Sequence, residues 1–311
     1  RDCQTPAPLT LPAHCTIFTG RYPIAHLVRN NGTYVLPEDE TTLAEVLKEK
    51  GYATSAVIAS FTVASKFGLR QGFDDYDEDF ESGSTFQNFN TELPADRIYE
   101  KFVKWLDRRP EKSFFSWLHF YDAHFPYVEH PGAGGKGKAA TNRARYDGEV
   151  AYVDHYVGLV VEALKARGLY ENTLIVLVGD HGEGFGEHKE FGHGIFCYGE
   201  SLHVPLVIHN PKLIPAGRAV DHRVGLIDVM PTILEALRIK APADVQGASL
   251  LKLINGGGRK TGGPVYFESL FGREENNWAP ITGLMDGRYK FISLPLPELY
   301  DLEQDAGETR N

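Results

Sequence analysis

The sequence predicts an α/β fold in which helices flank a doubly wound sheet, followed by a small antiparallel subdomain. Helical patterns alternate with short apolar runs over most of the chain, as in βαβ proteins. The apolar run at 174–178 lies between Asn172 and a glycine-rich stretch, which is typical of a buried parallel strand. After the glycines at 256–258, only strand-like patterns follow.

The first predicted helix covers residues 41–50, because Leu43, Val46 and Leu47 share one face and Gly51 follows it. A strand is predicted next, at 54–59. The same reasoning gives further helices at 96–108, 146–168 and 227–237, with Pro231 tolerated near the first turn of the last, and strands at 114–120, 174–178 and 204–208. The small subdomain is predicted to contain strands at 265–268, 289–293 and 298–302. We place the large domain at 1–254 and the subdomain at 255–311.

Composition limits the function classes. The 311 residues, 42% of them apolar, suffice for one large core, and no apolar run is as long as a membrane span. A net charge of −10 argues against nucleic acid as a partner. Three cysteines are too few and too scattered for a disulfide scaffold. Neither the oligomeric state nor membrane association can be read from these residues.

Adjacent Asp180 and His181 follow the run at 174–178, at the strand end where open α/β sheets bind ligands. Such a pair directs an oxygen and a nitrogen at one cation. The structural alternative is that Asp180 caps the next segment and His181 is a turn residue. Four histidines between 181 and 203 favour the site over that alternative.

Two other segments bring similar groups. The predicted strand at 114–120 is followed by Asp122 and His124, so two strands are expected to deliver Asp and His to one edge. Near the start of the chain, a hydroxyl and an imidazole are expected to share one short loop, at Thr10 and His14, and we take both as candidate catalytic residues.

Over nearly its whole length the chain resembles the sulfatase-like branch of the alkaline phosphatase superfamily. The resemblance rests on several blocks in the family's order, namely T-L-P-A-H-C-T-I-F-T-G-R-Y-P, L-A-E-V-L-K-E-K-G-Y-A-T, S-W-L-H-F-Y-D-A-H-F-P-Y, V-G-D-H-G-E-G-F-G-E-H, Y-G-E-S-L-H-V-P-L-V-I, V-G-L-I-D-V-M-P-T-I-L, D-G-R-Y-K-F-I and P-E-L-Y-D-L. It implies an alkaline-phosphatase-like mixed sheet flanked by helices. It also implies a periplasmic or membrane-anchored location, which the residues themselves do not indicate.

The family's C/S-x-P-x-R loop places Thr10 at the nucleophile position, with Pro12 two residues later and His14 where arginine often stands. Sulfatases convert the Cys or Ser at that position to formylglycine, for which threonine has no known route. The resemblance therefore implies a metal-activated threonine alkoxide, as in phosphodiesterases and phosphoethanolamine or glycerolphosphate transferases of the superfamily. Cys15 lacks the following Pro and Arg that modification requires, so we expect a small buried residue there.

A threonine nucleophile needs a divalent cation, because an aliphatic hydroxyl is too weak an acid near neutral pH. The resemblance makes Asp180, His181 and Thr10 its ligands, a set that suits Zn²⁺ or Mn²⁺ more than Ca²⁺. It also implies that His124 and His193 bind the ester oxygens or protonate the leaving group. Structural roles remain open for three histidines, His124 in a turn, His14 as a loop stabiliser, and His188.

Family members open with a strand ending in aspartates that complete the metal site. We expect this chain to lack that strand and regard Asp2, with no strand to position it, as a poor substitute. The block at 301–311 ends on the family's last motif residue, so we expect both ends to be truncated. Residues 131–140, rich in Gly and Lys, are expected to form a flexible surface loop. The acidic cluster of Asp74, Asp75, Asp77, Glu78 and Asp79 is expected to be a solvated turn.

The sequence therefore predicts a metal-dependent hydrolase or transferase that cleaves an anionic phosphate or sulfate ester through a covalent Thr10 intermediate. Two alternatives remain open. The first is a true sulfatase, which the overall block resemblance favours. The second is a catalytically inactive binding member of the fold, which the missing amino-terminal carboxylate favours.

Overall fold

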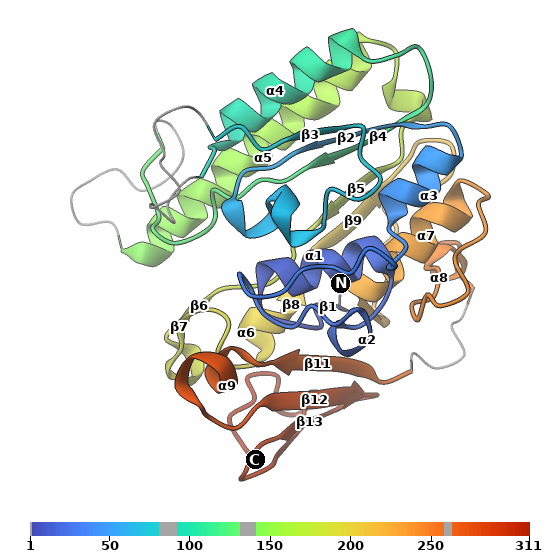
Figure 1. The fold of residues 1–311 in the computed structure, drawn as a ribbon. Helices are drawn as coiled ribbons and strands as arrows, with labels where there is room; N and C mark the ends of the chain where they lie inside the picture. The colour runs from blue at the N-terminus through green and yellow to red at the C-terminus, as the bar shows by residue number, and fades with distance from the viewer. Residues whose placement is uncertain (1, 81–91, 131–140, 258–262) are drawn as a thin grey trace. The chain divides into compact units, whose positions relative to one another are not determined.

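The structure is a computed structural model that describes residues 2–80, 92–130, 141–257 and 263–311 (Figure 1). The chain divides into two compact units, one formed by Arg1–Thr41 and Asn172–Asn311 and the other by Thr42–Glu171. The predicted surface loop at 131–140 lies outside the described residues. The boundary expected at residue 254 stays a prediction.

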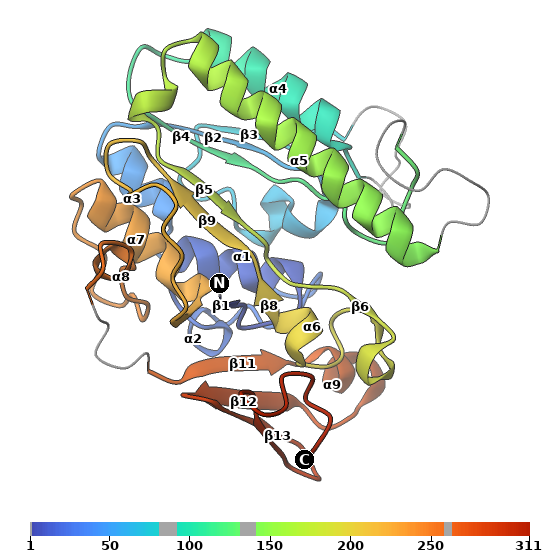
Figure 2. The same ribbon diagram turned by 180° about the vertical axis from the view of Figure 1, so that it is seen from behind.

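The unit Thr42–Glu171 contains a parallel sheet with helices beside it. Its central strand β2 (Ala53–Val57) is buried throughout and pairs in parallel with β3 (Asp75–Asp77) and β4 (Phe114–Leu118). Two helices, α4 (Ala95–Arg108) and α5 (Asn142–Ala166), pack side by side over this sheet in both views (Figures 1 and 2). The helices and strands predicted in this part of the chain are confirmed.

The helix α3 (Leu43–Glu49) begins two residues after the start predicted at residue 41. Thr42 accepts a hydrogen bond from Glu45 N–H, and the Glu45 carboxylate accepts one from Thr42 N–H, which forms a capping box. The short 3₁₀ helices η1 (Phe61–Val63), η2 (Ser65–Phe67) and η3 (Tyr170–Asn172) complete the local structure of this part of the chain.

The prediction of a solvated turn at the acidic cluster is wrong about the turn, because Asp75 and Asp77 lie on β3, but Asp74, Asp75 and Asp79 are exposed as expected. Asp75 accepts a hydrogen bond from the Trp105 indole at 2.8 Å, and Asp77 pairs with Lys101 at 2.7 Å. Both carboxylates of β3 therefore bind side chains of α4, and Lys101 compensates the charge of Asp77.

The other unit contains four separate sheets. β1 (Asp2–Gln4) lies between β10 (Arg223–Gly225), which is parallel to it, and β8 (His203–Val204), which is antiparallel. Asp2 thus has a strand, contrary to the expectation that none positions it. The predicted strand at 204–208 is interrupted at Pro205, which has no N–H to donate, and continues as β9 (Leu206–His209).

The strand β5 (Ile175–Val178) confirms the position predicted from the apolar run but not its pairing. It pairs with β9 in an antiparallel register, seen in Figure 2, and its Leu177 is 40% exposed. The expectation of a fully buried parallel strand is therefore wrong within this unit. A two-stranded hairpin follows, formed by β6 (Gly184–Phe185) and β7 (Phe191–Gly192) around η4 (Glu187–Lys189).

The helix α1 (Thr10–Thr19) replaces the short loop that was predicted to carry Thr10 and His14. Every residue of α1 is buried, and the helix packs against η5 (Leu226–Asp228) and α7 (Val229–Ala236). Its apolar face contributes Ala13 and Ile17 to a core that includes Leu226. Burial on all sides explains why no amphipathic pattern marks this helix. Short helices complete the unit: α2 (Pro23–His26), α6 (Gly199–Leu202), α8 (Leu251–Ile254) and α9 (Phe271–Asn276).

The carboxyl-terminal antiparallel subdomain is confirmed. Its sheet runs β11 (Val265–Ser269), β12 (Ile281–Asp286), β13 (Tyr289–Ser293) and β14 (Glu298–Asp301). The sequence predicts every strand except β12, which contains Gly283. A Cβ there would lie 2.2 Å from the Phe267 ring, so close packing requires this glycine inside a strand.

Together these elements confirm the predicted α/β class. Among the described residues, no helix combines the length and the apolar character that crossing a bilayer requires.

Candidate active site

Thr10 is the first residue of α1 and is only 1% exposed. The residue before it, Leu9, provides no side-chain cap, but Asn31 accepts a hydrogen bond of 2.9 Å from Leu11 N–H. The positive end of the helix dipole therefore lies at the Thr10 hydroxyl, where it favours negative charge.

The Thr10 hydroxyl contacts the imidazole of His181. The distance from Thr10 Oγ1 to His181 Nε2 is 3.3 Å, and His181 Nδ1 lies 2.9 Å from the Gly182 carbonyl oxygen. Because that carbonyl can only accept, Nδ1 carries the proton and Nε2 presents a lone pair to Thr10. Burial lowers the pKa of His181 to about 4, so the ring is neutral near pH 7.

Asp180 lies beside both histidines. Its Oδ2 is 3.5 Å from His181 Nε2 and 3.7 Å from His14 Nδ1. The same His14 nitrogen donates a hydrogen bond of 2.8 Å to the Thr10 carbonyl, one helical turn earlier. His14 therefore holds the backbone of the predicted nucleophile, as the structural alternative for this residue expects.

His193 faces the same cluster from the end of the β6–β7 hairpin. Its ring centroid lies 4.0 Å from that of His181, and its Nδ1 lies 3.3 Å from the carboxylate of Glu183. An N–H that points at a carboxylate fixes the ring in one orientation. Glu183 was not singled out from the sequence, although it lies within the V-G-D-H-G-E block.

A divalent cation fits these donors in part. Two ligands about 2.1 Å from one tetrahedral ion lie about 3.4 Å apart. The pair Thr10 Oγ1 and His181 Nε2 is separated by 3.3 Å, and the pair His181 Nε2 and Asp180 Oδ2 by 3.5 Å. Over the described ranges, however, no group of three or more His, Cys, Asp and Glu side chains is arranged to hold a metal. A complete site needs at least one donor beyond these three.

His124 belongs to the unit Thr42–Glu171, and its predicted role in binding the ester stays a prediction. Its Nδ1 donates to the Phe125 carbonyl at 2.6 Å, its ring stacks on Tyr121, and Glu92 lies 3.9 Å away. Burial, reinforced by the Asp122 charge, raises the pKa of Glu92 to about 7.

Asn31 is the site residue that the sequence indicates least, since no local pattern relates it to Leu11.

Cys15 is fully buried on α1, and burial raises the pKa of its thiol. Both observations agree with the expectation that Cys15 is a packing residue.

Two family models match this chain. The family model described as "Sulfatase" matches residues 1–239, and the model "N-sulphoglucosamine sulphohydrolase, C-terminal" matches residues 186–311. An arylsulfatase of Clostridium perfringens is 32% identical over 179 residues, which cover 56% of this chain and 37% of that protein. The chain thus spans little more than a third of the length of that relative.

Two solved structures share the fold. One, determined in complex with its substrate D-glucosamine-2-N,6-O-disulfate, has a TM-score of 0.81 at 20% identity and covers 100% of this chain and 85% of its own. The other, a phosphonate monoester hydrolase of Agrobacterium radiobacter, has a TM-score of 0.77 at 22% identity, covering 100% and 83%. At these identities the likeness concerns the fold alone.

Proposed function

The chain belongs to the sulfatase family, and on that basis we propose that it is a metal-dependent hydrolase or transferase that passes a phosphate or sulfate group from its ester to Thr10. The observation that carries the proposal is the 3.3 Å contact between Thr10 Oγ1 and His181 Nε2 at the start of α1. A buried hydroxyl at a helix N-terminus, beside Asp180 and His181, is an arrangement suited to forming an alkoxide.

Thr10, Asp180 and His181 would hold the cation. When bound, a divalent ion lowers the pKa of the hydroxyl and neutralises charge on the transferred group. Zn²⁺ and Mn²⁺ suit a donor set that mixes nitrogen and oxygen, and Ca²⁺ suits it less.

The other steps of the reaction are assigned to side chains of this site. Thr10 Oγ1 gives up its proton to solvent and forms a bond to phosphorus or sulfur as the bond to the ester oxygen breaks. That oxygen takes a proton from an imidazolium. We propose His193 for this role, because Glu183 holds its ring at 3.3 Å. The binding of the ester's anionic oxygens by His124 stays a prediction from the sequence. Water or an acceptor alcohol then cleaves the threonyl ester and restores Thr10.

The choice between phosphate and sulfate rests on Thr10. The threonine side chain has no route to formylglycine, so its hydroxyl would attack directly. A directly attacking threonine favours a phosphate ester, because the superfamily members with such a nucleophile act on phosphate. Sulfate ester hydrolysis is the second candidate, because the relative in Clostridium perfringens carries the name arylsulfatase. The fold does not decide between them, since it also occurs in a phosphonate monoester hydrolase.

The test compares an aryl phosphate monoester, an aryl phosphodiester and an aryl sulfate with protein loaded in turn with Zn²⁺, Mn²⁺ and Ca²⁺. We expect phosphoester turnover that falls by about 10³-fold or more in Thr10→Ala, with part of it kept in Thr10→Ser. The matched control is His155→Gln, an exposed histidine on α5.

Dominant sulfate turnover that depends on Thr10 would replace phosphate with sulfate as the substrate class. Turnover that is equal in the wild-type protein and in Thr10→Ala would contradict the nucleophile assignment. Absence of any turnover in protein shown to bind the metal would favour the binding role over the enzymatic one.

A further inference from the structure

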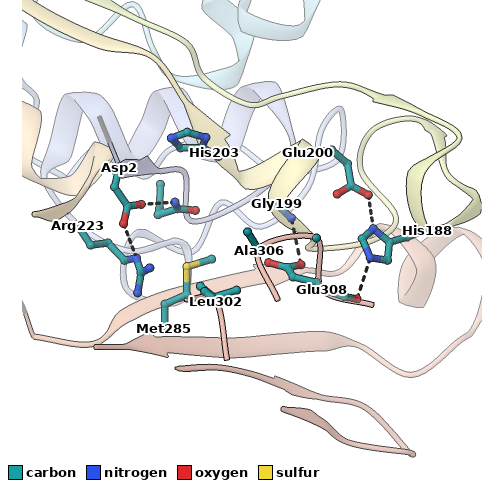
Figure 3. A pocket seen from close by; sticks show the side chains of 12 residues that line it. Asp2, His188, Gly199, Glu200, His203, Arg223, Met285, Leu302, Ala306 and Glu308 are labelled. Carbon is teal, nitrogen blue, oxygen red and sulfur yellow. Dashed lines mark hydrogen bonds and ion pairs between the residues drawn. The ribbon is translucent and has the colours of Figure 1, made fainter. Parts of the chain in front are cut away.

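His188 lies at the tip of the β6–β7 hairpin, away from the cluster around Thr10. It lines a cavity of about 310 Å³ together with residues of β1, α6, β10 and the carboxyl-terminal segment (Figure 3). Figure 3 shows its ring between the Glu200 carboxylate and the backbone of Glu308. The proposed reaction gives this histidine no role.

Both ring nitrogens of His188 face acceptors. Nδ1 lies 2.7 Å from Glu200 Oε1, and Nε2 lies 3.0 Å from the carbonyl oxygen of Glu308. A neutral imidazole carries one N–H, so it satisfies only one of these contacts and directs a lone pair at the other oxygen. With Glu200 ionised, both contacts are satisfied as hydrogen bonds by the imidazolium, which carries a proton on each nitrogen. Its ring also stacks on Tyr198 with 3.8 Å between centroids.

The contacts of His188 hold a strained turn. His188 has φ 46° and the next residue, Lys189, has φ 65°, both in the left-handed region that side chains other than glycine adopt rarely. Such a residue is strained and persists only where its surroundings fix it. When one of the two hydrogen bonds of His188 is lost, we expect His188 and Lys189 to leave the left-handed conformation.

This turn is connected to the proposed active site by the hairpin itself. Glu183 precedes β6 and His193 follows β7, and the two strands pair through Gly184 with Gly192. The helix α6 supports both ends, because Glu200 binds the tip while the Ser201 carbonyl accepts from Gly182 N–H at 2.9 Å. The contacts at the tip therefore help to set where the His193 ring lies.

The charged groups around His188 favour its protonated form. Glu200 on α6 is its direct partner, and Glu187 and Lys189 flank it on its own turn. Burial by itself lowers the pKa of His188, but the hydrogen bonds to Glu200 and to the Glu308 carbonyl outweigh burial, and the pKa is raised.

The remaining charges near the cavity are paired. The Glu308 carboxylate binds Lys290 of β13 at 2.8 and 2.9 Å and also accepts from Gly199 N–H. Across the cavity Arg223 pairs with Asp2 at 3.1 Å, and His203 completes the titratable lining. Glu200 is thus the carboxylate that forms an ion pair with the His188 imidazolium.

We propose that His188 is a positioning residue whose doubly protonated ring clamps the β6–β7 hairpin to α6 and the carboxyl-terminal segment. The clamp keeps the His193–Glu183 pair in place and opens when His188 loses a proton. This inference rests on the proposed function for its effect on catalysis, but the clamp exists independently of the reaction. Activity is therefore expected to fall at alkaline pH through kcat, with KM little changed.

The clamp is tested first without any substrate. Ring ¹⁵N chemical shifts of histidine-labelled protein, with the His188 signals identified by their loss in His188→Gln, report whether both nitrogens carry protons. We expect the imidazolium form at pH 6, and a titration above the ordinary histidine value of 6.5. In Glu200→Gln the His188 titration moves to lower pH, because the carboxylate charge is gone.

Hydrogen exchange then reports whether the proton fixes the tip. Three N–H groups close the turn, donated by Gly186, Lys189 and Glu190. Their protection factors, corrected for the intrinsic pH dependence of exchange, should fall about tenfold as pH rises through the His188 titration. In His188→Gln they should be low at all pH values, and in His155→Gln they should match the wild-type protein.

Activity gives the final readout. The alkaline limb of kcat should follow the His188 titration and move to lower pH in Glu200→Gln, and kcat of His188→Gln at pH 6 should be about tenfold lower. A neutral His188 at pH 6, or tip protection that is equal on both sides of its titration, would overturn the clamp. If no ester is hydrolysed by any variant, the proposed function fails while the ring shifts and exchange still decide the clamp.

Discussion

The Thr10 hydroxyl donates a hydrogen bond of 3.3 Å to Nε2 of His181, a residue 171 positions later in the chain. The contact joins the start of α1 to the segment that follows β5. His181 accepts it because its own Nδ1–H is held by the Gly182 carbonyl. One hydrogen bond at the neighbouring peptide thus fixes which nitrogen faces the predicted nucleophile.

Replacing His181 should weaken metal binding. In His181→Ala the proposed cation loses a nitrogen ligand, and we expect the affinity for Zn²⁺ and Mn²⁺ to fall by about 10²-fold or more. Isothermal titration calorimetry of both ions measures this, with His155→Ala as the control. Equal affinities in a folded His181→Ala protein would show that this imidazole is not a ligand.

Removing the Asn31 side chain should destabilise the beginning of α1. Asn31→Ala leaves the buried Leu11 N–H without the acceptor it has at 2.9 Å, which costs about 1 kcal/mol of unfolding free energy. Urea denaturation measures the difference against Asn276→Ala, an exposed position at the end of α9. A loss in Asn31→Ala no larger than in that control would contradict the capping role.

His26 should make the protein less stable in acid. Its Nδ1 accepts from Val28 N–H at 3.2 Å, and burial lowers its pKa from 6.5 to about 3, so the folded state holds the neutral ring. Between these values the unfolded chain binds one more proton. Stability is therefore fully present above pH 6.5 and declines by up to about 1.4 kcal/mol per pH unit as pH falls toward 3.

Urea denaturation of the wild-type protein and His26→Gln from pH 7 to pH 4 isolates this contribution. The other titrating groups are common to both proteins, so the difference in slope belongs to His26. Parallel stability profiles would mean that His26 is not held neutral in the folded state.

Glu149 should make the protein less stable as pH rises, the opposite of the effect of His26. It is 2% exposed on α5, its Oε1 accepts from Val128 N–H at 2.8 Å, and burial raises its pKa from 4.5 to about 8. The folded state then binds the extra proton between these values. Stability declines by up to about 1.4 kcal/mol per pH unit as pH rises from about 4.5 to about 8.

Glu149→Gln keeps an oxygen for Val128 and removes the ionisable group. We expect this variant to gain stability over the wild-type protein as pH rises to 8, as measured by thermal unfolding in parallel with Glu129→Gln, an exposed neighbour. A wild-type advantage over Glu149→Gln that grows with pH would show that the carboxylate is paired when ionised.

Local patterns predicted the elements that have local causes. The apolar face of α3, the apolar periodicity of α4 and the apolar run of β5 were all read correctly, because each depends on residues within one or two turns or on a single run. The pairing of β5 was not predicted from the sequence, because its antiparallel partner β9 follows only after the β6–β7 hairpin and α6. The strand β1 was missed because its three residues are stable only between β8 and β10.

The sequence by itself determined the α/β class, most element positions, and the residue types of the site around Thr10, Asp180 and His181. Only the tertiary structure decided that Thr10 begins a buried helix, that His14 holds its backbone, and that Asn31 and Glu183 contact α1 and His193. The physical reason is that residue type follows from local chemistry, whereas a hydrogen-bond partner is chosen by which segments the fold brings within about 3 Å of each other.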